Sequence, residues 1–85
     1  AAIDIQFRTN NTTKMSISNA GKVGIGNSSP SAFLHLLAGT ATANTAPLKL
    51  TSGTNLTTPE NGAMEFDGTN LYFTVGGVRK TIQLL

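Results

Sequence analysis

Several residue types are scarce in this chain of 85 residues, and each shortage excludes a class of protein. There is no cysteine, so disulfide frameworks and thiolate metal sites are excluded. No apolar run approaches the roughly 18 residues that a membrane-spanning helix needs, so we expect no membrane insertion. Charged residues make up only 12% of the chain, and the net charge is +2. Arg79-Lys80 is the one adjacent basic pair. Because nucleic-acid binders cluster such residues on one face, no nucleic-acid partner is expected.

Small polar residues dominate what remains. Thr, Ser, Asn and Gly supply 36 of the 85 residues, whereas Leu, Ile, Val, Phe and Met together supply 23. A lone domain of this size buries only about 60% of its unfolded surface, and disulfides or metals usually compensate for so small a core. This chain has no cysteine for that purpose, so we predict that it folds in association with other chains. An isolated monomer is not expected to be stable.

Apolar residues alternate with polar ones along the first part of the chain, which indicates strands rather than helices. The expected strands contain Ile3, Ile5 and Phe7, then Met15 and Ile17, then Val23 and Ile25, with turns at 10–12 and 19–22. Glycines alternate with Val23 and Ile25, which predicts neighbouring backbone on the other face of that strand. Residues 33–37 fit either an extended segment or a short helix begun by Ser29 and Pro30, and the extended form is favoured because the run is short.

The chain divides by composition into three segments. Residues 1–38 form an N-terminal segment of short strands, 39–47 a small polar linker, and 48–85 a C-terminal meander. In the last segment Leu48 and Leu50 flank Lys49 in an expected short strand. Residues 63–84 predict three antiparallel strands, because Asp67-Gly68 and Gly76-Gly77 are strong hairpin-turn dipeptides. The chain ends in strand-like sequence, which is typical of a fragment of a longer polypeptide.

Two blocks of sequence resemble those of a known family. The first runs Gly21-Lys22-Val23-Gly24-Ile25-Gly26, with Pro30 and Leu34-His35-Leu36 after it. The second runs from Pro47-Leu48-Lys49-Leu50-Thr51-Ser52-Gly53 to Pro59-Glu60-Asn61-Gly62-Ala63-Met64-Glu65-Phe66-Asp67-Gly68. Together, over residues 21–74, they are similar to segments of bacteriophage tail fibres and related virion fibres. The resemblance implies a homotrimeric, β-rich fibre shaft that stands upstream of a C-terminal tip or a self-cleaving chaperone domain.

Catalytic and metal sites have few candidates. Glu65 and Asp67 lie two residues apart and would suit glycoside hydrolysis, but Asp67 also suits the Asp-Gly turn, which leaves Glu65 facing solvent. Three copies of His35, the one histidine, would ligate an ion on a threefold axis, but a lone histidine beside leucines is more often structural. Gly24-x-Gly26 lacks the third glycine of a dinucleotide fingerprint. We therefore assign no catalytic, cofactor-binding or metal-binding residue and expect no cofactor.

A carbohydrate site is the remaining chemical alternative. Tyr72, Thr74 and Arg79 share the face of their strands opposite Phe73, and these groups suit sugars. A solvated polar face is the more ordinary interpretation, and an exposed Arg79-Lys80 pair would equally keep fibre surfaces apart.

The expected fold class is all-β, with short antiparallel strands and hairpins in an intertwined homotrimeric fibre segment. The expected main buried residues are Ile3, Ile5, Val23, Ile25, Leu48, Leu50, Phe66, Phe73 and Ile82. The expected function is structural and not enzymatic: a segment of a phage tail fibre on the virion, carrying or adjoining the host-receptor-binding tip. Its partners would be two further copies, other fibre or tail proteins and host surface polysaccharide. The alternative is a carbohydrate- or partner-binding β module of a virion or a cell-surface adhesin.

Overall fold

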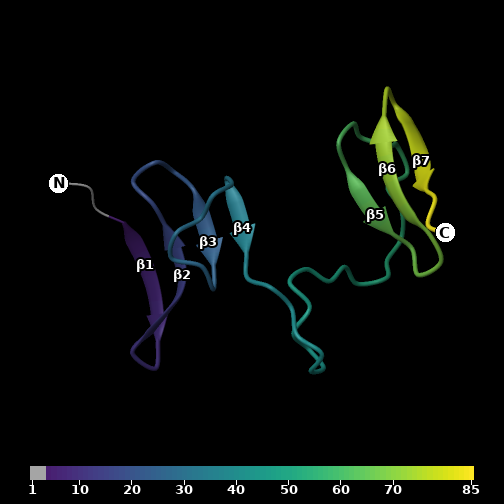
Figure 1. Ribbon diagram of the computed structural model, residues 1–85. Helices are drawn as coiled ribbons and strands as arrows, with labels where there is room; N and C mark the ends of the chain where they lie inside the picture. Colours follow the sequence, from purple (N-terminus) through teal and green to yellow (C-terminus); the bar gives the residue numbers. More distant parts are fainter. Residues whose placement is uncertain (1–3) are drawn as a thin grey trace. The chain divides into compact units, whose positions relative to one another are not determined.

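The computed structural model describes residues 4–85, and in this range the chain is all-β with no helix. Seven strands form a four-stranded sheet of order β1-β2-β3-β4 and a three-stranded sheet of order β5-β6-β7 (Figure 1). The chain divides into two compact units, Ala1–Leu48 and Lys49–Leu85, and each unit contains one sheet. No helix in the described range has the length and apolar character needed to cross a membrane.

The first sheet is made of short strands joined mainly by tight turns. Its strands are β1 (Ile5–Thr9), β2 (Thr12–Ile17), β3 (Val23–Ile25) and β4 (Leu34–Leu36). Asn10 and Asn11 turn the chain with φ of 51° and 58°, a left-handed conformation that asparagine tolerates better than most residues. The extended form expected for 33–37 is confirmed, because β4 occupies its centre. β4 nevertheless pairs parallel to β3, which the expectation of purely antiparallel strands missed.

The second sheet is the antiparallel meander expected over residues 63–84. It comprises β5 (Met64–Phe66), β6 (Leu71–Val75) and β7 (Val78–Ile82). Gly76 and Gly77 join β6 to β7 with φ of 60° and 76°, as a two-residue turn in a right-twisted hairpin requires. The turn between β5 and β6 covers residues 67–70, and Gly68 in it has φ of 96°.

The prediction of a strand around Leu48 and Leu50 is wrong for the single chain. Residues 37–63 contain no strand at all. Residues 40–45 form a small turn of their own, in which the hydroxyl of Thr45 donates to the carbonyl oxygens of Thr40 and Thr42. Because a strand needs a hydrogen-bonded neighbour, the alternating pattern at Leu48–Leu50 forms none within one chain.

The expected apolar core is also absent from the single chain. No hydrophobic side chain in residues 4–85 is buried, and the buried polar side chains are Ser16 and Thr74. Of the expected buried residues, Ile5, Ile25, Leu48, Leu50 and Phe73 are exposed, Val23, Phe66 and Ile82 are half-buried, and Ile3 lies outside the described residues. The alternating pattern placed these residues on common faces, and those faces lie open.

Candidate functional site

One face of the first sheet is mostly apolar, with Thr9 and Thr12 as a polar pair at its end. Ile5, Ile17, Val23 and Leu34 stand opposite one another across the four strands, and Phe7, Met15, Ile25 and Leu36 form a second row. Cross-strand partners project to the same side of a sheet, so these eight residues make up what we call the N-terminal apolar face. Phe7 is 52% exposed and Leu34 is 59% exposed. Ile5 and Ile25 are exposed as well, and the other four residues are half-buried.

Over β2 to β4, the opposite face of the first sheet is covered by its own chain. Ser16, Gly24 and His35 share this face, and the connection after β3 crosses it. The hydroxyl of Ser16 donates to the carbonyl oxygen of Asn27 over 3.3 Å. A Cβ atom on Gly24 would collide with that same carbonyl oxygen. The expectation that neighbouring backbone requires a glycine in this strand is therefore confirmed at Gly24.

His35 lies on this covered side, away from the apolar face. Its Nδ1 accepts a hydrogen bond of 3.0 Å from the backbone N–H of Ser31. The side-chain amide nitrogen of Asn27 lies 3.2 Å from each of the two ring nitrogens. No group of three or more metal-ligating side chains occurs within residues 4–85. The arrangement uses His35 as an acceptor that positions the connection after β3.

The second sheet repeats this division between an open and a covered face. Its open face, which we call the C-terminal apolar face, consists of Met64, Phe66, Leu71, Phe73, Val75, Val78 and Ile82. Met64, Val75 and Val78 are exposed, and Phe73 is 37% exposed. Lys80, the partner of Phe73 on β7, is the single charged residue on this side. Because β7 is an edge strand, the charge of Lys80 stands at the border of the face.

The polar face of the second sheet is covered by the segment that precedes it. The backbone of Leu56, in this segment, bonds to Glu65 and Arg79, whose side chains project from the polar face, and Gly53 donates its N–H to the carbonyl oxygen of Phe66 over 3.0 Å at the edge of β5. The side chain of Asn61 accepts from the N–H of Gly77 over 2.6 Å. Thr74 is only 1% exposed beneath this covering segment. The expectation that this side is a solvated polar face is therefore wrong.

Glu65 and Arg79 form an ion pair under the same segment. The Nε of Arg79 lies 2.8 Å from Oε2 of Glu65, and Oε1 accepts the backbone N–H of Leu56 over 2.6 Å. Arg79 also donates to the carbonyl oxygen of Leu56. The Leu56 N–H, and then the guanidinium, lower the pKa of Glu65 below its ordinary value. The expectations that Glu65 faces solvent and that Arg79 and Lys80 form an exposed pair are both wrong, since Glu65 and Arg79 bind the segment to the sheet.

Asp67 acts in the turn that it opens, as its Asp-Gly sequence suggests. Its Oδ1 accepts the backbone N–H groups of Thr69 and Asn70, each over 2.9 Å. Its Oδ2 accepts the hydroxyl of Tyr72 over 3.0 Å. The N–H groups of Asn70 and Thr69, and the Tyr72 hydroxyl after them, hold the pKa of Asp67 below its ordinary value. Both carboxylates expected near the turn therefore have structural partners.

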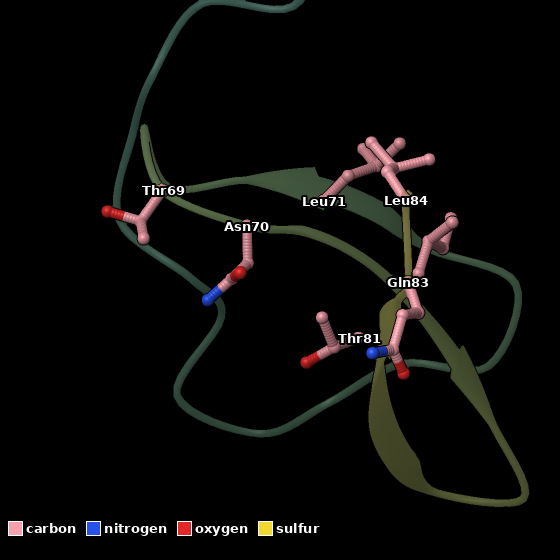
Figure 2. Close-up of a pocket in the computed structure, with 7 residues that line it drawn as sticks. Thr69, Asn70, Leu71, Thr81, Gln83 and Leu84 are labelled. Carbon is pink, nitrogen blue, oxygen red and sulfur yellow. The ribbon is translucent and has the colours of Figure 1, made fainter.

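A shallow depression lies beside β7, between the turn that opens β6 and the tail that follows Ile82 (Figure 2). Its volume is about 390 Å³, and it is lined by Thr69, Asn70, Leu71, Thr81, Ile82, Gln83 and Leu84. None of these side chains is aromatic or charged. The lining therefore offers neither a general acid or base nor the flat aromatic surface on which sugars stack.

Sequence reasoning grouped Tyr72, Thr74 and Arg79 on one face, and the structure confirms this grouping. The three groups are not available to a sugar as expected, because Tyr72 and Arg79 have partners within the chain and Thr74 is buried. What the single chain leaves exposed instead are residues of the two apolar faces. Their residues were visible in the alternating pattern, but the pattern did not show that they would lie open.

No protein-family model, no curated protein and no solved structure matches this chain.

Proposed function

We propose that this chain is a structural segment of a homotrimeric viral tail fibre, most like those of bacteriophages. The observation that carries the proposal is the pairing of covered polar faces with open apolar faces in both units. Each unit covers its polar face with its own chain and leaves seven or eight apolar residues on the other side. Further copies of this chain supply the missing apolar cover.

Identical copies suit these faces better than a charged or sugar-like partner. The N-terminal apolar face has no charged residue, and the C-terminal one has only Lys80 at its border. Burial of a side chain such as Phe7 or Leu34 contributes roughly 1.5–3 kcal/mol, and each copy offers many such side chains. The number of copies, three, rests on the resemblance of residues 21–74 to phage fibre segments.

In this proposal the protein's work is mechanical and not catalytic. Three chains bury their apolar faces together and form a stiff shaft on the virion that carries or adjoins the receptor-binding tip. Glu65, Arg79 and Asp67 act within the chain, where they hold the covering segment and the turn in place. No cofactor takes part, and other fibre or tail proteins are the neighbours at either end of the segment.

The mass of the assembly in solution tests this proposal. Analytical ultracentrifugation at several concentrations should give three times the mass of one chain, and the thermal midpoint should rise with concentration by mass action. Phe73→Ala should lower that midpoint, because loss of a buried phenyl ring costs about 3–5 kcal/mol per chain. Thr57→Ala, in an exposed part of the covering segment, is the matched control. A cooperative monomer with a midpoint independent of concentration would overturn the proposal.

A further inference from the structure

The segment of residues 47–52 has the sequence of a strand but no partner. Leu48 and Leu50 alternate with Lys49, and Leu48 is 66% exposed. Within residues 4–85, no backbone or side-chain hydrogen bond involves these six residues. The chain is tied down on either side, by the turn at 40–45 and by the bond from Gly53 to Phe66. An extended backbone with unpaired N–H and C=O groups is suited to adding to a sheet edge.

Four strands are sheet edges: β1, β4, β5 and β7. The edge of β5 is already approached by its own chain, since the carbonyl oxygen of Phe66 accepts the N–H of Gly53. β1 carries Arg8, and β7 carries Arg79 and Lys80, so Lys49 would meet like charge at both. β4 has the sequence Leu34-His35-Leu36 and contains neither Lys nor Arg. It is the edge that best accepts Leu48-Lys49-Leu50.

The free backbone groups of β4 are in the right place for such pairing. Val23 donates to the carbonyl oxygen of Phe33, and Leu37 donates to that of Ile25, so residues 33 and 37 turn their backbone groups toward β3. Backbone groups of successive residues in a strand point to opposite sides, and those of Leu34 and Leu36 therefore point away from β3. A strand added there would also place Leu48 and Leu50 beside Leu34 and Leu36 on the N-terminal apolar face.

We propose that residues 48–50 of one copy add as a further strand to β4 of a second copy. The partner is a second copy because these residues form no hydrogen bond with β4 in the single chain. This added strand buries Leu48 and covers Leu34, which is otherwise 59% exposed. It rests on the proposed function, and it specifies which residues tie one copy to the next beyond the packing of apolar faces.

Pairs of introduced cysteines test this contact, and no other disulfide can form because the natural chain has no cysteine. A Leu50→Cys chain and a Leu34→Cys chain, carrying different tags, are assembled together and oxidised. Leu48→Cys with Leu36→Cys, Leu48→Cys with Leu34→Cys and Leu50→Cys with Leu36→Cys are tested in the same way, so that both pairing directions are covered. We expect disulfide-linked dimers that contain one chain of each tag. Thr42→Cys with Leu34→Cys is the control and should give none, since Thr42 belongs to the self-contained turn.

Hydrogen exchange on the unsubstituted assembly gives an independent readout. Amide groups within 48–50 should be protected in the assembly, whereas those of the exposed Ala41 and Ala43 should exchange fast. A trimeric mass with fast exchange at 48–50 and no mixed dimer overturns this inference and leaves the proposed function standing. Disulfides that link only chains of the same tag overturn it as well. A folded monomer overturns both proposals together.

Discussion

Phe73 and Thr74 are consecutive residues of β6, and the hydroxyl-bearing side chain is the buried one. Thr74 is 1% exposed under the covering segment, while the ring of Phe73 stands 37% exposed on the C-terminal apolar face. Alternation along a strand puts the two side chains on opposite faces. The single chain therefore buries the polar face of its second sheet and leaves the apolar face uncovered. This inversion is why an assembly, rather than a monomer, is the form in which we expect the protein to be stable.

The first prediction concerns the hydroxyl of Thr74. Its Oγ1 is buried and has no hydrogen-bond partner in the structure. A buried unsatisfied polar group costs about 1–3 kcal/mol, so Thr74→Val, which keeps the shape, should leave the thermal midpoint unchanged or raise it. Thr74→Arg should lower the midpoint strongly, because the covering segment leaves no room. A marked loss of stability in Thr74→Val would show that the hydroxyl has a partner in the assembly.

The second prediction is a loss of stability in acid. The pKa of Glu65 is lowered from its ordinary value of 4.5 and that of Asp67 from 3.8, because both carboxylates accept backbone N–H groups. A group whose folded pKa is depressed contributes stability that is fully present above its unfolded pKa. That stability is lost as the pH falls through the folded pKa. The thermal midpoint should therefore decline as the pH falls below about 4.5.

Glu65→Gln tests the origin of this acid dependence. The variant should have a lower midpoint at neutral pH and a shallower decline in acid, because the charge that holds Arg79 and Leu56 is gone. Glu60→Gln is the matched control, since Glu60 is exposed and its side chain makes no hydrogen bond in the described range. If both variants titrated like the natural chain, Glu65 would not be a source of the acid sensitivity.

Several elements of the fold followed from local sequence and others did not. The meander of β5, β6 and β7 was predictable because Gly76-Gly77 and Asp67-Gly68 set the turns between alternating strands. The parallel pairing of β4 with β3 was not, because it depends on the path of residues 26–33 and no local pattern encodes that path. The membership of each apolar face was also readable from alternation. Which face the chain would cover was not, because Leu56 and Asn27 reach the polar faces through contacts distant in sequence.

The third prediction compares the hairpin glycines with a glycine of the linker. Gly68 and Gly77 have φ of 96° and 76°, where a side chain costs about 1–2 kcal/mol, whereas Gly39 has no such backbone conformation. Gly68→Val and Gly77→Val should each reduce the yield of assembled protein more than Gly39→Val. A Cβ on Gly39 would still lie 2.9 Å from Cδ of Pro47, so a modest loss is expected there too. If Gly39→Val were the most damaging, residues 39–47 would have to belong to the packed part of the assembly.

The fourth prediction concerns Gly24, where the neighbouring atoms decide whether substitution by alanine raises or lowers the stability. Gly→Ala at an unstrained position stabilises a protein by about 0.4–1 kcal/mol, because it restricts the unfolded chain. Gly53 fits that case, since an added Cβ would meet nothing closer than 3.9 Å. Gly24 does not, because its Cβ would collide with the backbone carbonyl oxygen of Asn27, which crosses the sheet there. We expect Gly24→Ala to lower the thermal midpoint and Gly53→Ala to keep or raise it. Equal midpoints for the two variants would mean that residues 26–33 can move off the polar face at little cost, and the first sheet would then lack a covered side.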